Sequence, residues 1–86
     1  MDVRSVPWVY MLRCRDGSLY TGAAKHLERR LAEHEVGTAS KYTRSRRPVA
    51  LVYSRRVRTW SHALREERRI KELSKARKED LVRDRT

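Results

Sequence analysis

Apolar residues in this chain gather into three short blocks with strand character and several stretches with helical spacing. The first block, residues 8–14 (WVYMLRC), is apolar at most positions, which is typical of a strand covered on both faces. Residues 15–17 (RDG) then give a turn signal, and residues 17–22 (GSLYTG) predict a second, shorter strand. The start of the chain therefore predicts a β-hairpin whose first strand is central.

The closure of this hairpin decides where its two tyrosines point. A two-residue turn at Asp16 and Gly17 places Tyr10 and Tyr20 on opposite faces of the sheet. A three-residue loop, with Gly17 left-handed in a bulge, pairs Leu12 with Tyr20 and brings both tyrosines to one face. The sequence leaves both geometries open.

Helical spacing replaces the strand pattern after the hairpin. Two leucines four residues apart predict a helix over residues 25–36, which Gly37 is well placed to end in a left-handed conformation. Residues 38–47 have no periodic apolar pattern and predict a basic loop. Pro48 then blocks helix, and the run VALVY at residues 49–53 predicts a third strand.

The last third of the chain predicts two helices. Thr59 or Ser61 can cap the first, and Ser74 can cap a shorter one that runs to about Val82. The apolar stripe of the longer helix consists of Trp60, Ala63, Leu64, Ile70 and Leu73. The resulting order is ββαβαα, in a single α+β domain over residues 1–86 with its core within residues 8–82.

A large excess of positive charge narrows the choice of partner. The 86 residues carry 22 Lys and Arg against 11 Asp and Glu, a net charge of +11, and most of the cations are arginine. Such an excess favours an acidic polymer, and the planar guanidinium suits phosphate. Intrinsic disorder would fit the charge but not the periodic apolar blocks. We therefore expect a folded domain that binds nucleic acid.

Cysteine usage and the length of the apolar runs indicate the compartment. Cys14 is the single cysteine, so no intrachain disulfide can form, and no Cys/His cluster has zinc-ligand spacing. These features fit a reducing cytoplasm. The longest apolar run is far shorter than a membrane span needs, so we expect no membrane contact.

Three charged or titratable residues interrupt the apolar faces of the predicted helices. Glu67 lies three residues after Leu64 and three before Ile70, in the middle of the apolar stripe. A carboxylate there must be paired with one of the arginines, hydrated in a cleft, or bound to a cation. Arg30 and His34 lie four residues apart on the apolar side of the first helix. Spacing alone fits a surface arginine and a core or helix-end histidine.

A basic segment without acids covers residues 41–58. Its cations are Lys41, Arg44, Arg46, Arg47, Arg55, Arg56 and Arg58. A phosphate track explains this uncompensated charge better than an ordinary solvated surface does. We expect nucleic-acid contacts from Lys41, Arg44, Arg46 and Arg47, with Tyr42 stacked on a base.

Taken together, these residues resemble the GIY-YIG nuclease superfamily. The resemblance rests on VYMLRCRDGSLYTG, HLERRLAEH, KYTRSRRPVALVY and ALREERRIKEL, in that order, and covers nearly the whole chain. It is strongest for the small members that consist of little beyond the nuclease domain. The two tyrosine triplets read VYM at residues 9–11 and YTG at residues 20–22. Ala23 stands where some members carry Lys, and Glu35 where related small members often carry Asn.

The resemblance implies a three-stranded antiparallel sheet flanked by helices, with an active site over one face of the hairpin and the first helix. By position it implies motif tyrosines at Tyr10 and Tyr20, catalytic Arg30 and His34, and a metal-binding carboxylate at Glu67. The implied activity is metal-dependent endonuclease hydrolysis of phosphodiester bonds in DNA or RNA. One Mg²⁺ or Mn²⁺ held by Glu67 would be the cofactor.

Each residue can take a role in that hydrolysis. Arg30 would clamp the non-bridging phosphate oxygens. Tyr10 would activate the water, provided that nearby cations lower its pKa. Tyr20 and His34 would orient the water or share its proton.

Two rival interpretations use the same fold without catalysis. A basic nucleic-acid-binding domain would need no divalent metal, whereas a structural partner of a ribonucleoprotein or acidic protein would need neither Tyr10 nor Glu67. Metal-dependent cleavage separates the nuclease from both. We expect a monomer, whose specificity a partner protein could supply.

Overall fold

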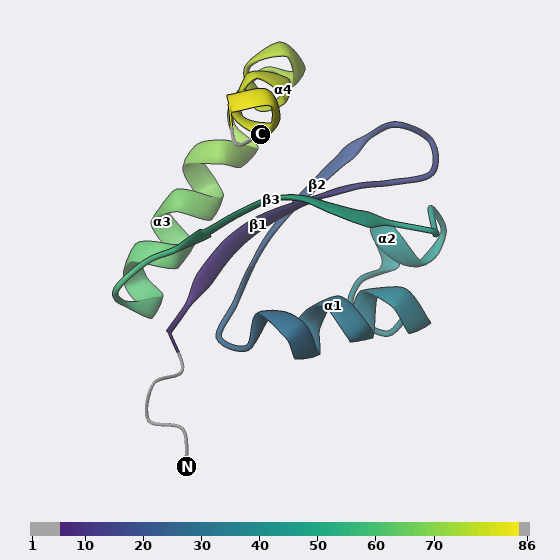
Figure 1. Cartoon of the computed structure of the whole chain (residues 1–86), viewed down its shortest axis with the longest axis horizontal. Helices are drawn as coiled ribbons and strands as arrows, with labels where there is room; N and C mark the ends of the chain where they lie inside the picture. Colours follow the sequence, from purple (N-terminus) through teal and green to yellow (C-terminus); the bar gives the residue numbers. More distant parts are fainter. Residues whose placement is uncertain (1–5, 85–86) are drawn as a thin grey trace.

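A computed structural model describes residues 6–84, and its strands form one antiparallel sheet with the first strand in the centre (Figure 1). β1 (Trp8–Arg13) lies between β2 (Leu19–Ala24) and β3 (Ala50–Arg56). Consecutive apolar residues in β1 have a covered face on either side, as their pattern predicts. The α+β class and the three-stranded antiparallel sheet are confirmed, and β3 continues past the predicted run.

Helices cover both faces of this sheet (Figure 1). α1 (Leu27–Val36) and the single turn α2 (Lys41–Arg44) lie on one side, and α3 (Trp60–Lys71) and α4 (Lys75–Asp84) lie on the other. None of the helices within residues 6–84 combines the length and the apolar composition that crossing a lipid bilayer requires.

α2 corrects the prediction of a loop over residues 38–47. Ser40 caps this turn, because its Oγ accepts a hydrogen bond from the Thr43 N–H at 3.1 Å. Apolar periodicity cannot reveal one turn of helix, since a single turn contains no repeat. The other local signals are confirmed: Thr59 caps α3, and Gly37 ends α1 with φ of 88°.

The hairpin closes through the three-residue loop. The Gly17 N–H donates to the carbonyl of Cys14 at 2.9 Å, and Gly17 has φ of 88°. In the resulting register Leu12 lies opposite Tyr20. Of the two geometries that the sequence left open, the structure therefore has the one that places Tyr10 and Tyr20 on the same face.

Side chains of β1 alternate between two cores. Val9 and Met11 pack with Ile70 of α3 on one side of the sheet. Tyr10 and Leu12 pack on the other side, against leucines of α1. Ala63 and Ile70 of α3 therefore lie on the face of the sheet opposite to Tyr10.

The buried stripe of α3 differs from its prediction at one position. Leu64 is 45% exposed, whereas Ala63 and Ile70 are fully buried and Glu67 lies between them. The sheet-facing residues are thus spaced by four and three rather than by three and three. Glu67 keeps its predicted place on this side of the helix, although Leu64 does not flank it there.

Thr21 of β2 provides a test of this packing. It lies on the same side as its partner Met11 and is only 4% exposed, yet its hydroxyl oxygen has no hydrogen-bond partner within residues 6–84. Thr21→Val replaces this desolvated hydroxyl by a methyl group of similar shape, so we expect the free energy of unfolding to rise by about 1 kcal/mol. Urea denaturation measures the change.

Thr59→Val is the matched control, for which we expect a change in the free energy of unfolding of the opposite sign. The Thr59 hydroxyl accepts the His62 N–H at 3.0 Å, so its loss removes the α3 cap and lowers the free energy of unfolding by about 1 kcal/mol. Destabilisation by Thr21→Val would show that its hydroxyl is satisfied after all.

Candidate active site

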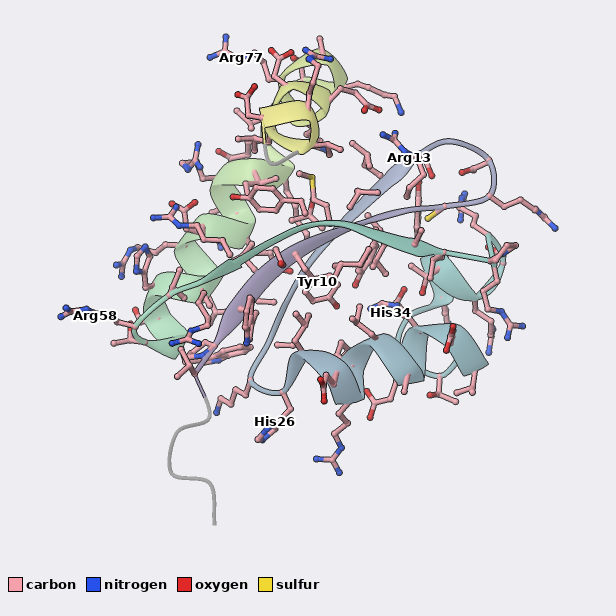
Figure 2. All side chains as sticks on the ribbon, in the orientation of Figure 1. Tyr10, Arg13, His26, His34, Arg58 and Arg77 are labelled. Carbon is pink, nitrogen blue, oxygen red and sulfur yellow. The ribbon has the colours of Figure 1, made fainter. Side chains whose placement is uncertain are left out.

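Three of the predicted catalytic side chains meet between the sheet and α1. The Tyr10 hydroxyl oxygen lies 2.8 Å from Nε2 of His34, and the ring centres of Tyr20 and His34 are 5.2 Å apart. The two tyrosine ring centres are 6.5 Å apart. Figure 2 shows Tyr10 and His34 in the layer between the sheet and α1. The structure therefore brings these three rings together as the resemblance implies.

Tyr10 reaches its partner by crossing Gly22 of the neighbouring strand. Gly22 lies opposite Tyr10 in the register, and a Cβ placed on Gly22 would be 2.6 Å from the Tyr10 hydroxyl oxygen. A side chain there cannot fit unless the tyrosine ring moves. The close approach of Tyr10 thus gives the physical reason for the glycine in the triplet YTG.

The second ring nitrogen of His34 is held by α2. Nδ1 lies 2.8 Å from the hydroxyl oxygen of Thr43, which is completely buried. The Ser40 hydroxyl oxygen lies 3.0 Å from that of Thr43. Sequence reasoning missed Ser40 and Thr43. Their signal is a serine three residues before a threonine, the spacing of a helix cap, in a stretch without apolar periodicity.

Burial keeps the Tyr10–His34 pair uncharged. Burial raises the pKa of the Tyr10 hydroxyl far above its usual value, and Arg30 acts in the opposite direction. Burial, followed by the positive charge of Arg30, lowers the pKa of His34. The expectation that cations lower the pKa of Tyr10 is therefore wrong, because desolvation of the phenolate outweighs them. At neutral pH a neutral phenol faces a neutral imidazole.

Arg30 lies on the open side of this cluster. Its guanidinium is partly exposed, and its Nε lies 3.4 Å from Oε1 of Glu33. Arg30 also lines a cleft of about 320 Å³ between α1 and the start of α3. Lys25, Arg29 and Trp60 line the same cleft, with the Lys25 ammonium 5.2 Å from the centre of the Trp60 ring. A cleft with three cations and an aromatic ring therefore adjoins the cluster.

Glu67 belongs to the helix on the opposite face of the sheet. Its Oε2 pairs with Nζ of Lys71 at 3.1 Å, and no hydrogen bond or ion pair within residues 6–84 joins it to Tyr10 or Arg30. Its negative charge adds to the effect of burial in raising the pKa of Tyr10. Glu67 therefore lies within electrostatic range of the tyrosine without touching it.

The neighbouring Glu66, rather than Glu67, forms ion pairs with arginines. Its Oε1 lies 3.2 Å from Arg55 and 2.9 Å from Arg69. The hydrogen bond from Arg69 is the main cause that lowers the pKa of Glu66. The interpretation of Glu67 as a partner of an arginine is therefore wrong, since its cation is Lys71.

The ligands available to a metal ion near Glu67 are few. Within the described residues, no three His, Cys, Asp or Glu side chains gather closely enough to enclose an ion. The Glu67 side chain is 20% exposed, and Lys71 is a more exposed partner that can swing away. A single carboxylate of this kind suits a hard divalent cation that keeps most of its shell as water.

Tyr42 is exposed, yet both its ring and its hydroxyl contact other residues of the protein. Its ring stacks on that of Tyr20 with 5.9 Å between centres, and its hydroxyl donates to the Ser18 hydroxyl at 2.7 Å. The guanidinium of Arg46 lies 3.8 Å from the centre of the Tyr42 ring and pairs with Asp16 at 3.1 Å. These contacts fasten α2 to the hairpin.

Lys41 and Arg44 are the exposed cations of α2. Neither forms an ion pair with another residue in the part of the chain that the structure describes. Arg47 instead donates to the carbonyl oxygen of Arg44 at 3.1 Å and to that of Glu35, at the end of α1, at 3.2 Å. Of the predicted nucleic-acid contacts, Lys41 and Arg44 are thus the most available.

The basic segment is divided by β3. Ala50 pairs with Arg13 beside the hairpin loop, whereas Arg56 pairs with Trp8 at the other end of β1. Arg58 lies beyond that end, far from α2 (Figure 2). A phosphate track over residues 41–58 would therefore have to follow β3 from one end of the sheet to the other, and this track stays a prediction.

Comparison with known proteins decides the family. A family model described as the GIY-YIG catalytic domain matches residues 6–80. This chain belongs to the GIY-YIG family. It is therefore a member of a nuclease-type superfamily, and the triplets around Tyr10 and Tyr20 occupy paired strands as the resemblance implies.

Within the GIY-YIG family the chain belongs to the small UPF0213 proteins. It is 51% identical over 79 residues to a UPF0213 protein of Natronomonas pharaonis, which covers 92% of this chain and 93% of that protein. It is 47% identical over 75 residues to a UPF0213 protein of Staphylococcus saprophyticus, covering 87% and 92%.

Two solution NMR structures share the GIY-YIG fold of this chain. The UPF0213 protein BH0048 from Bacillus halodurans is 42% identical with a TM-score of 0.59, covering 88% of this chain and 81% of that one. The protein EF2693 from E. faecalis is 36% identical with a TM-score of 0.64, covering 98% and 90%.

Gly22→Ala tests the close approach that shapes this GIY-YIG site. The Cβ of the new alanine would displace the Tyr10 ring and break the Tyr10–His34 hydrogen bond. We therefore expect the free energy of unfolding to fall by about 1 to 3 kcal/mol. Tyr10→Phe removes the hydroxyl of the same hydrogen bond but keeps the ring carbon Cζ, 2.7 Å from the new Cβ. Because both single variants lose this hydrogen bond, the double variant should lose less than the sum of the two in urea denaturation. Strict additivity would show that the hydrogen bond survives in Gly22→Ala.

Proposed function

We propose that this protein is a metal-dependent nuclease that hydrolyses phosphodiester bonds of DNA or RNA beside the Tyr10–His34 pair. The observation that carries the proposal is the buried 2.8 Å hydrogen bond of this pair, in contact with Tyr20 and next to a cationic cleft. Hydrolysis needs a base for the attacking water, charge relief at phosphorus and help for the leaving oxygen. Residues around the pair can supply each of these.

Proton removal begins at Tyr10 and ends at His34. A phenol whose pKa is raised by burial is not ionised at neutral pH, so Tyr10 cannot act alone as the base. It can accept a proton from water only while it passes its own proton to Nε2 of His34. A neutral imidazole with a lowered pKa is available for this transfer. Tyr20, which is partly exposed, is placed to orient the water.

Charge relief at the phosphate comes from Arg30. Its guanidinium can form two parallel hydrogen bonds to non-bridging oxygens, exchanging its loose pairing with Glu33. Lys25 and Arg29 line the same cleft and would neutralise adjacent phosphates, while Trp60 offers an aromatic edge to a base. At the loop end of the hairpin, Lys41 and Arg44 would extend the backbone contacts.

Glu67 would hold one Mg²⁺ or Mn²⁺ through its carboxylate oxygens. When bound, the ion would supply Lewis-acid stabilisation of the phosphate and the leaving oxygen. The Glu67 charge already reaches the Tyr10 hydroxyl, which supports its assignment to the same site. Lys71 occupies one carboxylate oxygen as an exposed cation that a divalent ion can replace.

Glu67→Gln is expected to lower metal-dependent cleavage by about 100-fold or more, because the amide binds a hard cation poorly. The free energy of unfolding in EDTA should change by less than about 1 kcal/mol, since the Lys71 pair is solvent-accessible. Cleavage is measured on labelled single-stranded, duplex and branched DNA and RNA with Mg²⁺, Mn²⁺ or EDTA.

Glu66→Gln is the matched control for that experiment. It changes the adjacent carboxylate of the same helix, which pairs with Arg55 and Arg69, and should retain cleavage. Unchanged cleavage by Glu67→Gln would show that Glu67 does not bind the metal ion that cleavage requires. Binding without metal-dependent cleavage of any of these substrates would identify a non-catalytic nucleic-acid-binding domain.

Neutralising the exposed cations of α2 tests the binding surface. Lys41→Gln with Arg44→Gln should reduce the slope of log K against log salt by about 0.7 to 0.9 for each lost phosphate contact. Arg55→Gln is the control, because Arg55 is paired with Glu66 at the far end of β3. An equal decrease in both proteins would place the phosphate contacts elsewhere.

A further inference from the structure

Four hydrogen-bonded side chains lead from Tyr10 through His34 to α2. The outer two are Thr43 and Ser40, which no sequence signal assigns to chemistry. The Thr43 hydroxyl oxygen lies 2.8 Å from Nδ1 of His34 and 3.0 Å from the Ser40 hydroxyl oxygen. Tyr10, His34 and Thr43 are each at most 1% exposed, so bulk water cannot satisfy their donors. Their protons must therefore be shared within the chain of hydrogen bonds.

One arrangement of protons satisfies every buried donor. With the imidazole proton on Nδ1, His34 donates to the Thr43 hydroxyl oxygen, and the bare Nε2 accepts the Tyr10 proton. The Thr43 hydroxyl then donates to the Ser40 carbonyl oxygen at 3.4 Å. The Ser40 hydroxyl oxygen accepts the Thr43 N–H at 3.1 Å.

The reverse arrangement leaves a buried donor without an acceptor. With the proton on Nε2, His34 donates to the Tyr10 oxygen, and the Tyr10 proton must find another partner. Within residues 6–84, Nε2 of His34 is the one hydrogen-bond partner of the Tyr10 hydroxyl. An unsatisfied phenol proton in a dry site is unfavourable. The geometry therefore favours the proton on Nδ1.

We propose that Thr43 is a positioning residue, which holds His34 in the Nδ1-protonated tautomer so that Nε2 stands ready to accept the Tyr10 proton. A base oriented by a third group is the usual arrangement in activated proton-transfer sites. The catalytic consequence of this proposal rests on the nuclease function proposed above, whereas the tautomer itself does not.

In hydrolysis the protons would move in one direction along this chain. An attacking water that comes in with the substrate would give a proton to the Tyr10 oxygen while Tyr10 gives its own to Nε2. The water oxygen then bonds to phosphorus, and the bond to the leaving oxygen breaks with its electron pair. The imidazolium keeps its Nδ1–H on Thr43, which therefore also stabilises the charged product of the transfer.

The charges that face this pair come from three elements. Tyr20 of β2 contacts the His34 ring, and Glu67 of α3 acts on Tyr10. Arg30 of α1 opposes a charge on His34, while Glu33 of the same helix favours it. None of these groups touches Nδ1 within the described residues, which leaves Thr43 as the side chain that accepts the Nδ1 proton, while Tyr10 donates to Nε2.

Nitrogen-15 NMR of the His34 ring in the full chain at neutral pH tests the proposal directly. Wild type should show a protonated Nδ1 and a bare Nε2. Thr43→Val removes the acceptor at nearly constant shape, so each tautomer then leaves one buried donor without an acceptor, and His34 should change from the Nδ1-protonated form to a mixture of both tautomers. Thr43→Ser keeps the hydroxyl and should restore the wild-type pattern. A wild-type proton on Nε2, or an unchanged pattern in Thr43→Val, overturns the proposal.

Thr21→Val is the matched control for the spectra. It makes the same change at a buried threonine on the other face of the sheet, whose hydroxyl has no partner among the described residues. His34 should keep its wild-type pattern there. If Thr43→Val does not fold, the wild-type spectrum and that of Thr43→Ser still decide the tautomer.

Cleavage kinetics separate this proposal from the nuclease assignment. For Thr43→Val we expect kcat to fall by about 100-fold while KM changes by less than about threefold, and Thr43→Ser should retain most of kcat. Full kcat in a Thr43→Val protein with a shifted tautomer would overturn the positioning role. Absence of cleavage by wild type would refute the nuclease function, whereas the NMR spectra would still test the tautomer of His34 independently.

Discussion

The register of the hairpin is the constraint on which the candidate site depends. Gly17, with φ of 88°, lets a three-residue loop close the hairpin and sets Leu12 opposite Tyr20. Because side chains alternate along a strand, a slip of one residue would send Tyr20 to the α3 side and separate it from Tyr10. The rings around His34 meet only in this register. The geometry of the hairpin loop therefore decides whether the candidate site can form at all.

Burial then decides the chemical state of the site. Tyr10 crosses Gly22 without room for a side chain and meets His34 where solvent is excluded. Such surroundings disfavour both phenolate and imidazolium, so the pair stays neutral and hydrogen bonded. Any proton transfer through the pair therefore starts from two neutral groups.

Some of the positively charged side chains form ion pairs that hold the fold together, and others extend into solvent without an ion pair among the described residues. Arg46 joins α2 to the hairpin by pairing with Asp16, and Arg69 pairs with Glu66 on α3. Lys41 and Arg44 extend into solvent instead. A count of cations along the chain cannot separate these uses, because ion pairs form between residues that the fold brings together. The surface available to a polyanion is consequently smaller than the composition suggests.

The sequence by itself determined the strands, the longer helices and the residues that break their patterns, but not the single turn α2. A run of apolar residues predicts β1, Thr59 and Gly37 mark helix ends, and a carboxylate on an apolar stripe draws attention to Glu67, because these signals act within a few residues. Only the tertiary structure decided that Leu64 faces solvent, since packing sets the rotation of a helix about its axis. It also decided the contact between Thr43 and His34 and the loss of solvent at Tyr10. Desolvation and hydrogen bonds between distant segments depend on how the layers assemble, and no local pattern contains that information.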